Sequence, residues 1–140
     1  MKYYSLKPEV AGGWGPQTVA DTRVHPPVVK KLNYEFDGWL GDDILETFPC
    51  YIITKRLSDL LTVSPLTGYE IDDVVISYSE TFMELYPNKK MPTFFWLKII
   101  GTAGIEDFGA ENNNRLVVSE TVMNLLARVQ IKYCDISDFK

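Results

Sequence analysis

This sequence is poor in the residues that build metal and nucleophilic sites. It contains one histidine and two cysteines, and Cys50 and Cys134 lie far apart without a CxxC spacing. A zinc site needs more histidine or cysteine ligands than the chain supplies. A Ser–His–Asp or Cys–His site would have to use His25, which precedes two prolines in a Gly- and Pro-rich segment. We therefore expect no metal site, no cofactor and no catalytic residues, and predict that the protein is not an enzyme.

Positive charge is also scarce. The chain has 14 basic and 19 acidic residues, a formal net charge of −5 and a pI near 4.8. Nucleic-acid binding needs a footprint of lysine and arginine on the phosphates, so we expect no nucleic-acid partner. The field of an acidic protein attracts a basic one, which makes a basic protein the expected kind of partner.

Long apolar runs are absent. The most apolar stretch, FFWLKII, is strand-sized and far below the ~20 residues of a membrane span. The first residues, MKYYSLKPEV, lack the apolar centre of a signal peptide. We expect no membrane association and a cytoplasmic location, where Cys50 and Cys134 would remain reduced. The sequence leaves a bridge between these two cysteines open, and it leaves the oligomeric state open.

What the chain does contain is material for one core. A length of 140 residues with 46% hydrophobic residues fits a single domain spanning 1–140. Residues 1–30 are rich in Gly and Pro and predict an extended arm, whereas 31–140 predict a sheet and helices.

Two segments share a strand–helix–strand pattern at a constant offset of 65 residues. Thr54 and Ser119 are expected helix N-caps, and the apolar positions that follow match pair by pair: Leu57 with Val122, Leu60 with Leu125, Leu61 with Leu126, and Ile71 with Ile136. Any two strand–helix–strand units would share part of this pattern. We expect an α/β or α+β domain with a mixed β-sheet, a few short helices and two similar strand–helix–strand units in one sheet.

The remaining segments have simpler patterns. Residues 32–40 alternate as a strand, and ETFMELYP (80–87) predicts a short helix. TFFWLKIIG (93–101) predicts a central strand, and 102–115 predict a polar loop.

The stretch FDGWLGDDILETFPC (36–50) is the strongest candidate for a functional surface. It carries Asp37, Trp39, Asp42 and Asp43, but not the spacing of a calcium loop. Glycines beside aspartates are good turn formers, so we expect an acidic tip bearing a tryptophan. A second acidic patch is expected at Asp72 and Asp73. Solvated turns would explain the acidic residues equally well, and core packing would explain Trp39.

The stretches MKYYSLKPEVAGGWG, FDGWLGDDILETFPCYIIT, LTGYEIDDV and RLVVSETVMNLL, followed by CDISDF, resemble a group of small bacterial immunity proteins of polymorphic or contact-dependent toxin systems. The resemblance covers most of the chain, and its motifs carry no catalytic signature. It implies a cytosolic, non-enzymatic protein that binds its toxin and blocks the active site or the substrate path. Many such toxins are nucleases with basic grooves, which an acidic protein fits by mimicking nucleic-acid charge.

Three functions remain open at this point. The first is an immunity protein that neutralises a basic toxin through Asp37, Trp39, Asp42 and Asp43, with Asp72 and Asp73 as a second patch. The second is a small enzyme or ligand-binding domain with a carboxylate pair in a cleft near Glu35 and Asp37. The third is a structural adaptor without a toxin.

Overall fold

Two four-stranded sheets contain eight of the thirteen strands. The computed structural model describes residues 1–140 and is an α+β domain. One sheet has the order β11 (Phe108–Ala110), β12 (Leu116–Ser119), β1 (Tyr3–Lys7), β13 (Asp135–Phe139); the other has the order β6 (Ile44–Thr47), β7 (Cys50–Thr54), β10 (Phe94–Ile99), β8 (Tyr69–Asp72). The helices are α1 (Lys55–Thr62), α2 (Glu80–Leu85) and α3 (Glu120–Leu126), and none is long and apolar enough to cross a membrane.

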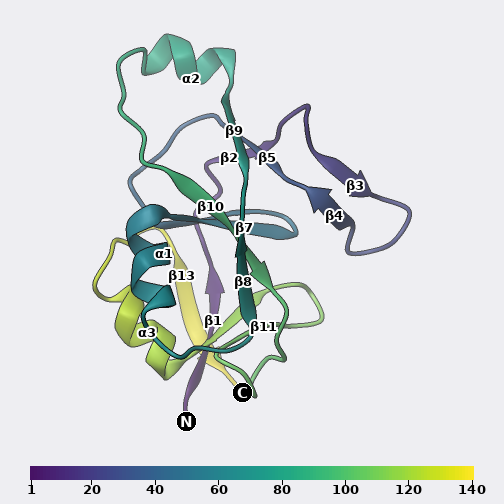
Figure 1. Cartoon of the computed structure of the whole chain (residues 1–140), viewed down its shortest axis with the longest axis vertical. Coiled ribbons are helices and arrows are strands. Elements are labelled where there is room, and N and C mark those ends of the chain that lie inside the picture. Colours follow the sequence, from purple (N-terminus) through teal and green to yellow (C-terminus); the bar gives the residue numbers. More distant parts are fainter.

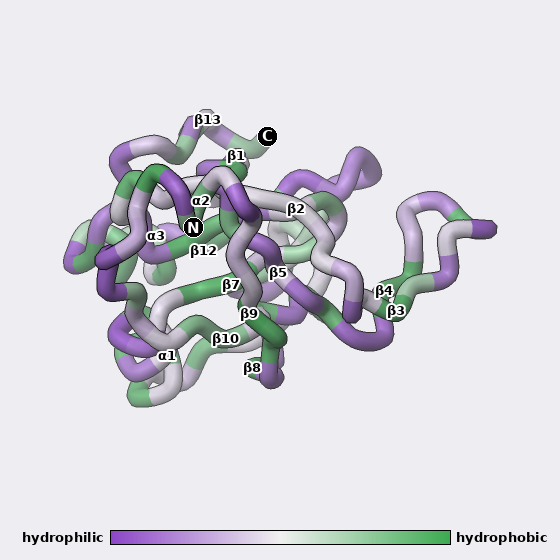
Figure 2. Tube along the Cα trace, turned by 90° about the horizontal axis from the view of Figure 1, so that it is seen from above, coloured by the Kyte–Doolittle hydropathy of each residue, from purple (hydrophilic) through white to green (hydrophobic).

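Two smaller sheets complete the fold. A three-stranded sheet has the order β2 (Gly12–Trp14), β5 (Asn33–Phe36), β9 (Val75–Tyr78), with β5 and β9 parallel. A two-stranded sheet of β3 (Val19–Asp21) and β4 (Val28–Lys31) forms an arm that projects to one side of the body (Figures 1 and 2).

The two large sheets have the same internal wiring. β7–α1–β8 and β12–α3–β13 are the two strand–helix–strand units, and in each a strand from elsewhere in the chain is inserted between the two strands. Leu97 of β10 lies opposite Tyr51 and Ile71, and Leu6 of β1 lies opposite Leu116 and Ile136. The predicted offset of 65 therefore relates the registers of the two sheets as well as their sequences. The prediction that both units share one sheet is wrong, because each unit has its own inserted strand.

The side chains of the main core are related in the same way as the two sheets. Its twelve buried side chains come from both sheets and from α1 and α3, and they form equivalent pairs: Leu6 with Leu97, Ile44 with Phe108, Tyr51 with Leu116, Ile53 with Val118, Leu57 with Val122, and Leu61 with Leu126. We call the sheet of β7 with α1 the first half of the fold, and the sheet of β12 with α3 the second half. Each half thus contributes one member of every pair to a shared interior.

A second core covers the opposite face of β7 and β10. Ile52 and Trp96 alternate with Ile53 and Leu97, and they pack against Tyr34 and other residues of the small three-stranded sheet. Burial on both faces explains why YIIT is a continuous apolar run rather than an alternating one. Cys50 lies in this second core, while Cys134 lies at the edge of the main core, and both are free thiols.

Several expectations are confirmed and others are corrected. Thr54 and Ser119 are N-caps, α2 lies within 80–87, and β10 is a central strand. The expectation of an extended arm over 1–30 is wrong for its first part, because β1 is an inner strand and Leu6 is fully buried. The expected loop 102–115 contains β11, whose three residues were too few to give a strand pattern.

Two aspartates join the halves at the helix N-caps. Thr54 donates its hydroxyl proton to Asp43, and Ser119 donates to Asp107 Oδ1 at 2.7 Å. Asp43 Oδ2 also accepts the backbone N–H of Gln130, which follows α3, whereas Asp107 Oδ2 accepts the N–H of Thr67, which follows α1. Each carboxylate therefore binds backbone from the other half. We call these two arrangements the Asp43 latch and the Asp107 latch.

Asp107→Ala should lower the free energy of unfolding by about 2 kcal/mol, because it leaves the Thr67 N–H and the Ser119 cap without their acceptor. Urea unfolding measures this loss. Asp138→Ala, at an exposed position of β13, is the matched control and should change stability by less than about 0.5 kcal/mol. Equal effects of the two substitutions would show that the latch contributes nothing specific.

Candidate partner-binding surface

Asp42 and Asp43, two of the expected partner-binding residues, are buried. Their exposed fractions are 0% and 1%. Asp42 accepts hydrogen bonds from the backbone N–H groups of Lys132 at 3.0 Å and Tyr133 at 2.7 Å, and from the Gln130 side chain at 3.1 Å. The expectation that these two carboxylates form an acidic tip is therefore wrong. Their negative charge orders the segment after α3.

Asp43 is held as an anion by its surroundings. Burial acts to raise its pKa, but hydrogen bonds from Arg56 at 2.7 and 2.6 Å, from Thr54 and from the Gln130 N–H outweigh burial and lower the pKa below its usual value. Arg56 lies at the rim with 64% of its side chain exposed. In this ion pair Asp43 is buried, whereas Arg56 is exposed to solvent.

Trp39 combines both roles that its sequence context allowed. The side chain is half-buried and packs edge-on against Phe94, with ring centroids 5.8 Å apart. Its indole N–H donates to the Asp42 carbonyl at 2.9 Å. Asp37, two residues earlier, is exposed. One side of the indole thus belongs to the core, and the rest borders the surface.

Three adjoining hollows meet around Trp39. One of about 360 Å³ contains Glu9, Asp37, Trp39, Leu40 and Tyr86 in its lining. A second of about 370 Å³ shares Trp39 and adds Arg56, Lys90 and Met91; a third of about 460 Å³ shares Tyr86 and Met91 and adds Tyr78, Met83 and Lys89. We call this region the Trp39 surface.

Several apolar side chains are exposed on the Trp39 surface. Leu40 is 58% exposed and Met83 is 53% exposed, and Tyr86 is also open to solvent. The charges around them are mixed, with Arg56, Lys89 and Lys90 beside Glu9 and Asp37. The region is therefore an apolar surface with both signs of charge, which differs from the purely acidic surface that the sequence predicted.

Asp72 and Asp73 are exposed, but they do not join the Trp39 surface. The parallel pairing of β5 with β9 places Asp73 and Asp37 at opposite ends of these strands, roughly 20 Å apart at about 3.3 Å per residue. Asp72 forms an ion pair with Lys98 at 3.5 Å. β8 is an edge strand, as is its counterpart β13 with Asp135 and Asp138. Negative charge on both edges protects them from pairing with other chains.

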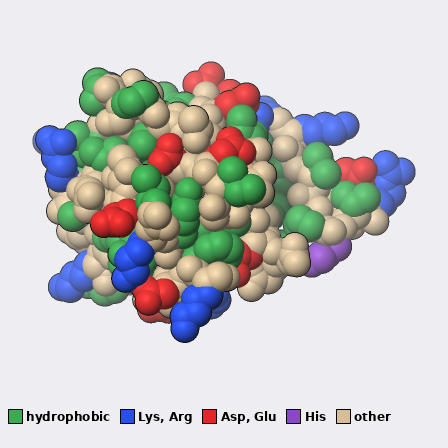
Figure 3. All heavy atoms as spheres, turned by 90° about the horizontal axis from the view of Figure 1, so that it is seen from below, with side chains coloured by type: hydrophobic (Ala, Val, Ile, Leu, Met, Phe, Trp, Pro, Cys, Tyr) green, Lys and Arg blue, Asp and Glu red, His purple; other side chains and the backbone are tan.

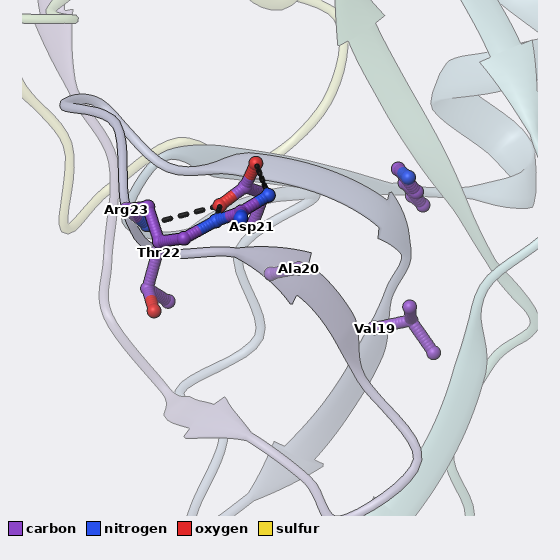
Figure 4. Close-up of a pocket in the computed structure, with 6 residues that line it drawn as sticks. Val19, Ala20, Asp21, Thr22 and Arg23 are labelled. Carbon is purple, nitrogen blue, oxygen red and sulfur yellow. Dashed lines mark hydrogen bonds and ion pairs between the residues drawn. The ribbon is translucent and has the colours of Figure 1, made fainter.

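The arm has a separate hollow of about 390 Å³, lined by Val19, Ala20, Asp21, Thr22, Arg23 and Lys30 (Figure 4). Asp21 and Arg23 form an exposed ion pair across it at 3.0 Å, which adds little stability because water screens the charges. Basic side chains and the single histidine lie on this projecting arm (Figure 3). None of the expected site residues lines this hollow.

The expected carboxylate pair of Glu35 and Asp37 does not share a cleft. Glu35 accepts a hydrogen bond from Ser77 at 3.3 Å, whereas Asp37 lines a hollow with Glu9. Burial raises the pKa of Glu9, and the nearby Asp42 raises it further. Sequence reasoning missed Glu9, because no local pattern links it to a segment thirty residues away.

Asp43→Asn should lower the free energy of unfolding at pH 7 by about 2 to 3 kcal/mol. The loss stays below that of a fully buried pair because Arg56 can be hydrated when its partner is gone. The ionised Asp43 stabilises the fold above its unfolded pKa near 3.9, and this contribution is lost as pH falls through the lower folded pKa.

Wild type should therefore lose more stability than the variant between about pH 5 and pH 2, as measured by urea unfolding at each pH. An unchanged thermal midpoint at neutral pH would mean that Asp43 behaves as an exposed carboxylate and that the latch is unimportant.

The Trp39 surface offers both apolar contacts and ion pairs. Its apolar part comprises three partly exposed aromatic side chains (Trp39, Tyr78 and Tyr86), two methionines and the exposed Leu40, and charged side chains surround it. No group of three or more His, Cys, Asp or Glu side chains lies close enough together to hold a metal ion. Comparison with protein-family models, curated proteins and solved structures finds no match to this chain.

Proposed function

We propose that this chain is a non-enzymatic immunity protein that binds and neutralises a bacterial toxin, and that the Trp39 surface makes the contact. The observation that carries the proposal is the exposure of Leu40, Met83 and Tyr86 around a fixed tryptophan. Exposed apolar patches rimmed by polar groups mark interaction sites. The resemblance to small cytosolic immunity proteins supports the same function, acting in the bacterial cytoplasm.

The Trp39 surface has the features of a binding hot spot. Trp and Tyr dominate the energetics of interfaces, and Met side chains adapt to an incoming surface. Trp39 is already fixed by Phe94 and by its bond to the Asp42 carbonyl. Little side-chain entropy is then lost when a partner packs against it.

The charge of the chain favours a basic toxin, such as a nuclease with a positive groove. A net charge of −5 and the exposed Asp72 and Asp73 attract such a partner at a distance. At close range, the mixed charges of the Trp39 surface fix the orientation. In this proposal steering and anchoring are carried out by different parts of the molecule.

A ligand-binding or enzymatic function is the second candidate, and the pKa of Glu9 is the observation that favours it. Glu9 and Asp37 line one hollow, and a buried carboxyl with a raised pKa is a common feature of active sites. A small uncharged molecule that raises the thermal midpoint of wild type but not of Glu9→Gln would support this function over the first.

If a toxin is encoded beside this gene, as the proposed function requires, Leu40→Arg combined with Met83→Arg should abolish protection against it. The two arginines remove apolar contact and repel a basic partner at the Trp39 surface. Growth of a host that expresses the toxin together with each variant is the measurement.

Val63→Arg combined with Ile105→Arg is the matched control, because it makes the same charge change at two exposed apolar positions outside the Trp39 surface. The control should protect as wild type does. Protection by the first variant, or loss of protection with both, would contradict the proposed contact.

Asp72→Asn combined with Asp73→Asn should slow association with the purified toxin roughly two- to tenfold at low salt and weaken its salt dependence. Dissociation should change little, because these residues lie outside the contact. Stopped-flow fluorescence at several salt concentrations measures both rates. A larger change in dissociation than in association would place Asp72 and Asp73 inside the interface.

A further inference from the structure

We propose that the rings of Trp39 and Tyr86 are a receptor for the ammonium or guanidinium group of a partner's lysine or arginine, and that the Lys89 ammonium lies over these rings until the partner displaces it. This inference rests on the proposed function, since it names the chemistry that the Trp39 surface recognises.

The contacts of Lys89 show that the rings of Trp39 and Tyr86 accept a cation. Its Nζ lies 5.6 Å from the centroid of the Trp39 ring and 5.2 Å from that of Tyr86, and it donates to the Trp39 carbonyl at 3.0 Å. Each of the other lysines that lie over an aromatic ring contacts a single ring. Two π-faces and a carbonyl oxygen together make a site for a positively charged group.

Two carboxylates lie next to these rings, in a hollow that Lys89 itself does not line. Glu9 and Asp37 line the same 360 Å³ hollow as Trp39 and Tyr86. Glu9 Oε2 accepts the Leu40 N–H at 3.2 Å, but Glu9 Oε1 is buried without a hydrogen-bond partner. It is the one buried side-chain oxygen or nitrogen in the chain that lacks such a partner. A buried acceptor without a donor is unfavourable, and Glu9 must turn this oxygen toward the hollow to accept an incoming N–H.

The charges near Glu9 agree with this assignment. Burial raises the pKa of Glu9, and the positive charge of Lys89 lowers it. A cation in the hollow therefore favours the ionised carboxylate, and the ionised carboxylate favours the cation.

Lys89 is placed so that it can leave. It is exposed, and it lies in the turn after α2, where its N–H donates to the Tyr86 carbonyl at 3.2 Å. Its long side chain can swing into water without unfolding any element. A partner's cation then replaces one ammonium with another on the same two rings, and an acidic protein gains a specific contact with a basic partner.

The test uses the Trp39 indole N–H signal in ¹H–¹⁵N spectra of the full chain, assigned with Trp39→Phe, during titration with n-butylammonium or n-butylguanidinium chloride at constant ionic strength. Lys89→Ala should bind both cations roughly tenfold more tightly than wild type, because the internal competitor is gone. The neutral n-butanol should cause no comparable shift. Glu9→Gln or Asp37→Asn, added to Lys89→Ala, should weaken cation binding severalfold.

Equal binding by wild type and Lys89→Ala, or equal shifts with n-butanol, would overturn the receptor. Asp37→Asn guards against a folding defect in the Glu9 variant, because Asp37 is exposed. Failure of the proposed function looks different: the cations would bind as expected, yet the chain would not protect against the toxin. Protection without any cation binding would refute the receptor and leave the proposed function standing.

Discussion

The fold depends on two carboxylates that bind backbone across the boundary between equivalent halves. Asp43 and Asp107 each accept a helix-capping hydroxyl from their own half and a backbone N–H from the other. A buried or partly buried carboxylate is unfavourable unless donors surround it, so each latch fixes the position of the opposite half relative to its own helix. The shared core of twelve side chains then packs in one arrangement. The latches lie at the N-caps of α1 and α3. The carboxylate that binds each capping hydroxyl therefore also binds the other half of the fold.

The Asp43 latch also supports the surface proposed to bind a partner. Asp42 and Asp43 turn the chain between Trp39 and β6, and the Asp42 carbonyl holds the indole N–H. At the equivalent position of the second half, Asp107 has no arginine partner, whereas Asp43 has Arg56 at the rim of a hollow. The two halves therefore share an architecture but differ in what they present to solvent. Only the Asp43 latch includes an arginine, and that arginine lines a hollow next to Trp39.

Much of this could be predicted from sequence where the signal is local. The N-caps at Thr54 and Ser119, the helices after them and the central strand at 93–101 follow from capping and periodicity over a few residues. The offset of 65 also relates the registers of the two sheets, although the pattern itself predicted a single sheet. The burial of Asp42 and Asp43 could not be predicted in this way, because the donors to the Asp42 side chain and the Gln130 N–H that binds Asp43 lie in residues 130–133, and nothing near the aspartates indicates them. The separate sheets were missed for a similar reason, since β1 lies at the opposite end of the chain from the strands that it joins.

The position of β1 brings the two ends of the chain next to each other without a covalent bond between them. β10 follows β8 directly in its own half, but β1, its counterpart, completes a half whose other strands come more than a hundred residues later. During synthesis β1 therefore has no partner until β12 has been made, and the second half is complete only when β13 follows. Tyr3 lies opposite Phe139, so the two ends of the chain finish side by side. A circular permutation that joins those ends and opens the loop between β10 and β11 would make the strands of each half contiguous in sequence. This loop is therefore the boundary between the two halves.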